Sequence, residues 1–204
     1  RKAHVPWLPL DDLVPLKPTW ALVYGALYLF LILLPVLAVR QEEHIRRTVW
    51  AYLAVWISAY VCFLAYPTLA PRPPEVIGEG FGVWGLRFLY SADPPYNCFP
   101  SLHVAHSFLS ALTCYRLHRG TGIAAVLAAL LVGVSTLYAK QHYVLDVVAG
   151  MLLAFVAYAV FFRNYPRERI PELDRRLAPV LALGLIGLIG LGVACTFLVY
   201  RSLR

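Results

Sequence analysis

Two short segments of this 204-residue chain bring together side chains that could do chemistry. Residues 97–103 read Asn-Cys-Phe-Pro-Ser-Leu-His and end at His103, and residues 140–146 read Lys-Gln-His-Tyr-Val-Leu-Asp and contain His142 and Asp146. Both segments lie at the edges of long apolar stretches, where one ionisable side chain costs on the order of 2.5–3.5 kcal/mol at a helix centre. Their residues are therefore the first candidates for a functional site.

His142 and Asp146 are four residues apart, so on a helix they share one face and the carboxylate can accept a hydrogen bond from one imidazole nitrogen. That bond fixes the tautomer and leaves the lone pair of the other nitrogen facing outward, as a nucleophile or base requires. A buried His–Asp pair that only links two helix ends is an equally good interpretation of this spacing alone.

His103 follows Ser101 by two residues, at the predicted start of a span. Pro100 suits the first position of that helix, and the free N–H groups of a helix N-terminus form a site for an anion. Ser101 is expected to add a further hydrogen bond. His106, one turn later, is expected to face a neighbouring helix rather than the site.

Two cations are predicted on the same side of the membrane as these motifs. Arg72 lies between prolines after the second span and offers a planar fork for phosphate oxygens, whereas Lys140, two residues before His142, acts as a point charge. A loop arginine beside prolines is usually only solvated. Together with Ser101 and the two histidines, however, these cations suit a phosphoryl group.

The composition is that of a membrane protein. Hydrophobic residues make up 60% of the chain and charged residues 14%, against roughly a quarter charged in soluble domains. Spans of about twenty apolar residues cross a bilayer core of roughly 30 Å. This criterion predicts an all-α bundle of about six transmembrane helices, at residues 20–39, 48–66, 104–117, 122–138, 143–162 and 178–200.

Loops on the cytoplasmic side of a membrane are enriched in Lys and Arg. Once Arg72 and Lys140 are set aside as site residues, the loops after the first, third and fifth spans are the more basic ones. Both motifs are therefore expected on the extracytoplasmic or lumenal side, in a multi-pass protein of the cell (inner) membrane.

The spans divide the chain into four predicted parts. Residues 1–19 form an interfacial segment broken by prolines, and residues 20–162 form the catalytic membrane core. Within this core, residues 67–95 are expected to be a long ordered loop, and loops of such length are usually functional or disordered. Its aromatic residues suit a lid or a plain headgroup anchor. Residues 163–177 are a cytoplasmic connector, and residues 178–204 hold a last helix.

The formal net charge of +7 does not indicate nucleic acid as a partner, because the basic residues are spread over short loops. Membrane orientation and contact with anionic lipid headgroups explain the charge better. The four cysteines have neither the pattern of a disulfide framework nor the spacing of a zinc site.

The chain resembles the membrane branch of the type 2 phosphatidic acid phosphatase (PAP2) superfamily. Three motifs occur in the family's order over roughly residues 60–160: Arg72-Pro73, Pro100-Ser101-Leu102-His103 and His142 to Asp146. The resemblance implies a membrane lipid as substrate, attack by His142 on phosphorus to form a phosphohistidine, orientation by Asp146, and protonation of the leaving alcohol by His103. It implies no metal and no cofactor.

The chain departs from the family pattern at three positions. Ala65 stands where the pattern has a lysine, Leu102 where it has a glycine, and Thr136 where it has an arginine. Two phosphate-binding cations are thus missing, and Lys140 is expected to compensate for one. The Pro-Ser-Leu-His form of the second motif and the Ser135-Thr136 pair look more like the inositol phosphorylceramide and sphingomyelin synthases, which pass a phospho-headgroup to a lipid alcohol.

Three functions follow from these patterns. The first is a lipid phosphatase or phosphotransferase, and the second is a headgroup transferase of the sphingolipid-synthase type. The third is a catalytically silent lipid transport or binding protein, which the presence of all three candidate catalytic residues disfavours.

Overall fold

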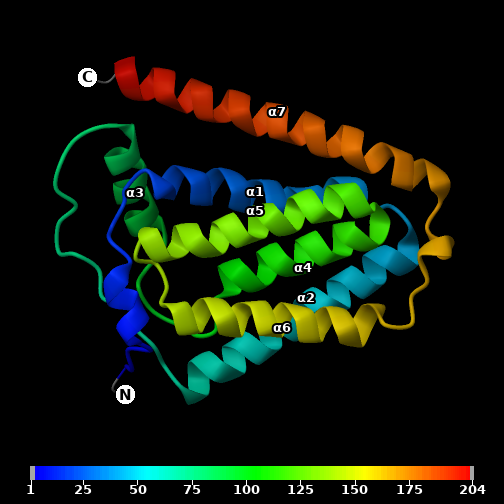
Figure 1. Cartoon of the computed structure of the whole chain (residues 1–204), viewed down its shortest axis with the longest axis horizontal. Coiled ribbons are helices and arrows are strands. Elements are labelled where there is room, and N and C mark those ends of the chain that lie inside the picture. The colour runs from blue at the N-terminus through cyan, green and yellow to red at the C-terminus, as the bar shows by residue number, and fades with distance from the viewer. Residues whose placement is uncertain (1–2, 203–204) are drawn as a thin grey trace.

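The computed structural model describes residues 3–202, and in this part of the chain the fold is entirely helical (Figure 1). Its seven α-helices are α1 (Trp20–Ala38), α2 (Glu42–Ala65), α3 (Phe81–Ala92), α4 (Leu102–Leu117), α5 (Arg119–Tyr138), α6 (Val144–Phe162) and α7 (Glu172–Ser202). Two short 3-10 helices, Pro9–Leu13 and Arg167–Arg169, complete it. The predicted all-α fold is confirmed.

Within residues 3–202, five helices are long and apolar enough to cross a membrane: α1, α2, α5, α6 and α7. The protein is a multi-pass membrane protein. The remaining predicted span corresponds to α4, which with 16 residues is shorter than the other five. It is the central helix, surrounded by α1, α2, α5 and α6. Its buried small side chains, such as Ser107, Ser110 and Ala111, let these neighbours pack closely around it.

α4 begins later than the sequence suggested. Ser101 is the residue that caps the helix, and its hydroxyl oxygen accepts a hydrogen bond from the Val104 N–H at 3.3 Å. Pro100 therefore precedes the cap and is not the first helical residue, which corrects that prediction. A serine satisfies one of the free N–H groups of a helix N-terminus, which explains why the helix starts here.

The segment 67–95 contains a helix that the sequence analysis did not predict. α3 starts after Gly80, whose φ of 114° suits a residue without a side chain. Trp84 and Phe88 stack on one face of α3, and Phe81 and Trp84 contact Tyr200 of α7. These aromatic rings join the helix to the bundle, so the segment is not a loop throughout.

α7 begins at Glu172, whereas the sequence analysis placed the start of the last span at Ala178. It packs mainly on α1 and leans away from the bundle in Figure 1. Small residues such as Gly184 and Gly187 of α7 allow helices to pack closely in a membrane. A Cβ added at either glycine would have no neighbouring atom within 4 Å, so neither position is a close contact between helices.

One end of the bundle gathers every segment that carries a candidate site residue. The start of α4 and α6 and the end of α2 and α5 meet there, and α3 and the N-terminal segment lie beside them (Figure 1). The N-terminal segment is bound to this end through Asp11. Its carboxylate accepts a hydrogen bond from the N–H of Val144, the first residue of α6, at 2.8 Å.

Candidate active site

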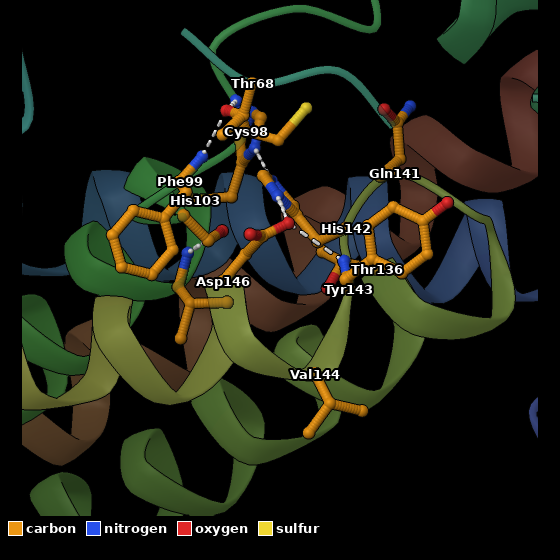
Figure 2. Close-up of polar contacts among 12 residues, drawn as sticks. Thr68, Cys98, Phe99, His103, Thr136, Gln141, His142, Tyr143, Val144 and Asp146 are labelled. Atoms are coloured by element: carbon orange, nitrogen blue, oxygen red, sulfur yellow. Dashed lines mark hydrogen bonds and ion pairs between the residues drawn. The ribbon is translucent and has the colours of Figure 1, made fainter. Parts of the chain in front are cut away.

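The two histidines from separate motifs contact each other directly. His103 Nδ1 lies 3.2 Å from His142 Nε2, and His142 Nδ1 lies 3.4 Å from Asp146 Oδ2 (Figure 2). His142 is 8% exposed and Asp146 is fully buried. Three side chains thus form one continuous chain of polar contacts.

The partners in this chain determine where the protons lie. An ionised carboxylate only accepts hydrogen bonds, so Asp146 fixes the proton of a neutral His142 on Nδ1. His142 Nε2 then carries a lone pair, and His103 Nδ1 must be the donor to it. The arrangement therefore pairs an unprotonated nitrogen on His142 with an N–H group on His103.

Asp146 is held by the start of its own helix. Its Oδ2 also accepts a hydrogen bond from the Tyr143 backbone N–H at 2.9 Å (Figure 2). The backbone of α6 is in turn joined to that of α4, since the Ser101 N–H donates to the Asp146 carbonyl oxygen at 3.1 Å. Gly150 allows this approach, because a Cβ there would lie 2.5 Å from the Ser101 carbonyl oxygen.

The turn before α4 is positioned by Thr68, which the sequence analysis did not single out. Its hydroxyl oxygen accepts hydrogen bonds from the backbone N–H groups of Cys98 at 2.8 Å and Phe99 at 3.0 Å (Figure 2). A lone Thr after a span gives no sequence signal of such a role. Burial raises the pKa of the Cys98 thiol to about 12, so this neighbour of the site stays protonated.

A cavity of about 310 Å³ opens beside the two histidines. Its lining includes His103, His142, His106 and Gln141, together with Tyr28 of α1 and Asp93, which follows α3. Burial raises the pKa of Asp93, although the nearby Arg72 and His142 oppose this shift. Burial therefore favours the neutral form of the Asp93 side chain, which lines the same cavity as the histidines.

Arg72 is connected to this cavity by a hydrogen bond to Gln141, which lines it. Its guanidinium donates to the Asp93 carbonyl oxygen at 2.6 Å and to Gln141 Oε1, and it stacks over the Tyr90 ring with its Cζ 4.5 Å from the ring centroid. Because arginine has only donors, Gln141 must present its oxygen to Arg72. The Gln141 Nε2 is buried and has no partner among the described residues.

Ser101 and Lys140 lie near the histidines but have other partners. Ser101 is fully buried as the cap of α4. The ammonium group of Lys140 donates to the backbone oxygens of Val14 at 2.5 Å and Asp11 at 3.3 Å. Lys140 shares with His142 and Arg72 the lining of a second cavity, of about 380 Å³, under the N-terminal segment.

Comparison with known proteins identifies the family of this chain. The sequence model of the PAP2 superfamily matches residues 7–160, so the chain belongs to the PAP2 superfamily. The sphingolipid-synthase-like subgroup is not distinguished by this match.

Two curated relatives are similar to parts of the chain. A PA-phosphatase related-family protein of Dictyostelium discoideum is 32% identical over 117 residues, which cover 49% of this chain and 21% of the relative. An uncharacterized protein of Methanocaldococcus jannaschii is 27% identical over 95 residues, which cover 47% of this chain and 39% of the relative. The chain thus spans less than two fifths of each relative's length. No solved structure matches it.

Proposed function

We propose that this protein transfers the phosphoryl group of a membrane lipid through a covalent phosphohistidine on His142. The observation that carries the proposal is the polar chain from Asp146 through His142 to His103, with an unprotonated Nε2 facing an N–H donor. Membership of the PAP2 superfamily and the membrane-spanning helices support a lipid phosphatase-type function.

In the first half of the reaction, His142 Nε2 attacks phosphorus and forms a P–N bond while the bond between phosphorus and the lipid oxygen breaks. His103 Nδ1 gives its proton to that oxygen, which leaves as the lipid alcohol. The Asp146 carboxylate stabilises the positive charge that develops on the His142 ring.

In the second half, water or an alcohol attacks phosphorus from the side that the lipid oxygen has left. His103 takes a proton from the attacking oxygen, the P–N bond breaks, and His142 Nε2 regains its lone pair. Both half-reactions require the attacking and leaving atoms to be in line through phosphorus. The phosphoryl group must therefore separate His103 Nδ1 from His142 Nε2, which are 3.2 Å apart in the free protein.

Arg72 and Gln141 are the groups that would stabilise the phosphoryl oxygens, since preorganised donors near developing charge are usually the largest catalytic term. Ser101 and Lys140 remain proposed phosphate ligands from the sequence motifs. In the structure their polar groups are bonded to the protein, so each would have to exchange partners to reach a phosphate.

The test is a rapid-quench assay with phosphatidic acid that carries labelled phosphate. The proposal expects an acid-labile, alkali-stable label on the protein, which is absent from His142→Ala. His118→Ala is the matched control, because His118 caps α5 at the opposite end of the bundle. Full turnover by a folded His142→Ala protein would disprove the nucleophile assignment.

A headgroup transferase is the second candidate, favoured by the low positive charge of the cavity. Arg72 is engaged by the protein and the cavity presents the neutral amide of Gln141, which suits a singly charged phosphodiester better than a doubly charged monoester. Two assays separate them: a labelled lipid phosphodiester offered with a lipid alcohol, and a labelled lipid phosphomonoester offered without one. Labelled phosphate moved to the alcohol indicates transfer, and free phosphate released from the monoester indicates hydrolysis.

A further inference from the structure

A second group of polar side chains lies within the membrane-spanning region, next to the site. His106 of α4 is placed between Tyr28 of α1 and Trp56 of α2. Its Nδ1 lies 3.2 Å from the Tyr28 hydroxyl oxygen, and its Nε2 accepts a hydrogen bond from the Trp56 indole N–H. The sequence predicted that His106 faces a neighbouring helix, and it contacts two of them. An ionisable residue inside a membrane usually has a function.

The indole decides the tautomer of His106. Because an indole N–H is only a donor, the Nε2 of His106 must carry a lone pair, and a neutral His106 then has its proton on Nδ1. His106 therefore donates to the Tyr28 hydroxyl oxygen, and Tyr28 accepts. The Tyr28 hydroxyl proton is left without an acceptor among residues 3–202.

Tyr28 and His106 stand where two cavities meet. Both residues line the catalytic cavity, and both also line a groove of about 480 Å³ between α1 and α2. The Tyr28 ring also meets the His103 ring edge to face, with centroids 5.0 Å apart. The free hydroxyl proton therefore lies next to the catalytic histidine, at the mouth of the groove.

The groove itself is apolar and runs away from the catalytic cavity. Along α2 it extends from Trp56 to Ile45, which is about 16 Å at 1.5 Å per helical residue. This length is about half of a bilayer core of roughly 30 Å, the depth that one lipid chain covers. The rest of its lining is mainly aliphatic and comes from α1, including Ile32 and Val36, and from Val39 directly after it.

We propose that the groove between α1 and α2 holds one acyl chain of the lipid substrate, and that the Tyr28 hydroxyl donates a hydrogen bond to the carbonyl oxygen of that acyl group. This inference rests on the proposed function, since it places the lipid phosphate in the adjacent catalytic cavity. His106 is a positioning residue that orients the hydroxyl, and Trp56 fixes the tautomer of His106.

The chemistry of Tyr28 selects a carbonyl as its ligand. Its oxygen already accepts a bond from His106, so the remaining capacity of the hydroxyl is chiefly that of a donor. Between the phosphate and the hydrocarbon chain of a diacyl lipid, the acyl carbonyl oxygens are the strong acceptors. A lipid whose chains are joined through ethers lacks them and leaves the proton unpaired.

The experiment compares dioleoyl phosphatidic acid with its dialkyl ether analogue in mixed micelles. The wild type should turn over the diacyl lipid with a kcat/KM roughly tenfold higher, the ratio that one ordinary hydrogen bond supplies. Tyr28→Phe should lower the diacyl value to the ether value and leave the ether value unchanged. His106→Phe should also lower the ratio of the diacyl kcat/KM to the ether kcat/KM.

Tyr52→Phe is the matched control. Tyr52 also lines the groove, but its hydroxyl is already hydrogen-bonded to Ser110, so this variant should keep the diacyl preference. Equal turnover of the two lipids by the wild type, or an equal loss for both in Tyr28→Phe, would overturn the inference and leave the proposed function standing.

Absence of turnover for either lipid would instead contradict the proposed phosphatase activity. In that case, the shift in thermal unfolding midpoint that each of the two lipids causes can be measured instead, because it needs no turnover. It tests whether Tyr28 recognises the acyl carbonyl oxygen. A larger shift with the diacyl lipid that disappears in Tyr28→Phe supports it, and equal shifts in the wild type refute it.

Discussion

Replacement of Gly150 by alanine should separate α4 from α6 and thereby disturb the contact between the two histidines. Gly150 lies one turn after Asp146 on α6, opposite the first turn of α4. An alanine Cβ would lie 2.5 Å from the Ser101 carbonyl oxygen and 3.3 Å from the Ala105 nitrogen. Both neighbours are backbone atoms of the helix start that presents His103, so they cannot rotate away.

The magnitude follows from that distance. Ordinary contact begins at 3.4 Å, so the two helices must move apart by nearly 1 Å at this point, and overpacking of this kind costs about 1–3 kcal/mol. Alanine is better than glycine in a helix by about 1 kcal/mol, which offsets part of the loss. We expect a net destabilisation of up to about 2 kcal/mol.

The effect on catalysis should exceed the effect on stability. A 1 Å misplacement of a reacting group can reduce the rate by about 10²-fold, and His103 and His142 lie on the two helices, or directly before them, that would separate. The measurement is kcat for phosphatidic acid hydrolysis alongside the thermal unfolding midpoint in the same detergent.

Gly184→Ala on α7 is the matched control for this experiment. No neighbouring atom lies within 4 Å of a Cβ at Gly184, so this change should leave kcat unaltered and raise stability by at most about 1 kcal/mol. A Gly150→Ala protein with wild-type kcat and an unchanged unfolding midpoint would refute the reasoning.

Three further predictions concern the site itself. Asp146→Asn should lower kcat by on the order of 10³–10⁴-fold, because an amide can hold His142 in the wrong tautomer. Quantifying the folded protein by size-exclusion chromatography checks that misfolding is not the cause, and retention of more than a tenth of the activity would contradict the prediction. Gln141→Glu keeps the size and the contact with Arg72 but replaces an amide donor by a negative charge. It should leave thermal stability unchanged or higher and weaken inhibition by vanadate by roughly 10²-fold, as loss of one donor to an oxyanion does; vanadate inhibition equal to wild type would show that Gln141 only positions its neighbours. Because burial raises the pKa of Cys98 to about 12, N-ethylmaleimide at neutral pH should neither label this residue nor inhibit the enzyme, and mass spectrometry of the treated protein checks this directly.

Local spacing accounts for most of what could be predicted. The long apolar segments predicted a helical membrane protein, and the four-residue separation of His142 and Asp146 predicted their hydrogen bond, which is present. Both features depend on neighbours along the chain, so the regular geometry of a helix is enough to infer them.

The cap at Ser101 is a local contact with Val104, three residues on, and it was missed because the sequence did not show where α4 begins. The other missed contacts depend on partners that are distant in the sequence. Lys140 has the charge of a phosphate ligand, yet its ammonium group is bonded to the N-terminal segment, more than 120 residues away. The structure also revealed Thr68 and Gln141 as the residues that hold the second motif and Arg72.

The sequence by itself determined that this protein lies in a membrane, that it is helical, and which residue types stand at its site. Hydrophobicity and helical periodicity are properties of short segments, so they can be read from the sequence alone. Only the tertiary structure decided that His103 and His142, 39 residues apart, share a hydrogen bond, and that His106 joins α1 and α2 beside them. The physical reason is that helices pack through the shapes of whole faces, such as the close approach at Gly150, and no spacing within one segment encodes which faces will meet.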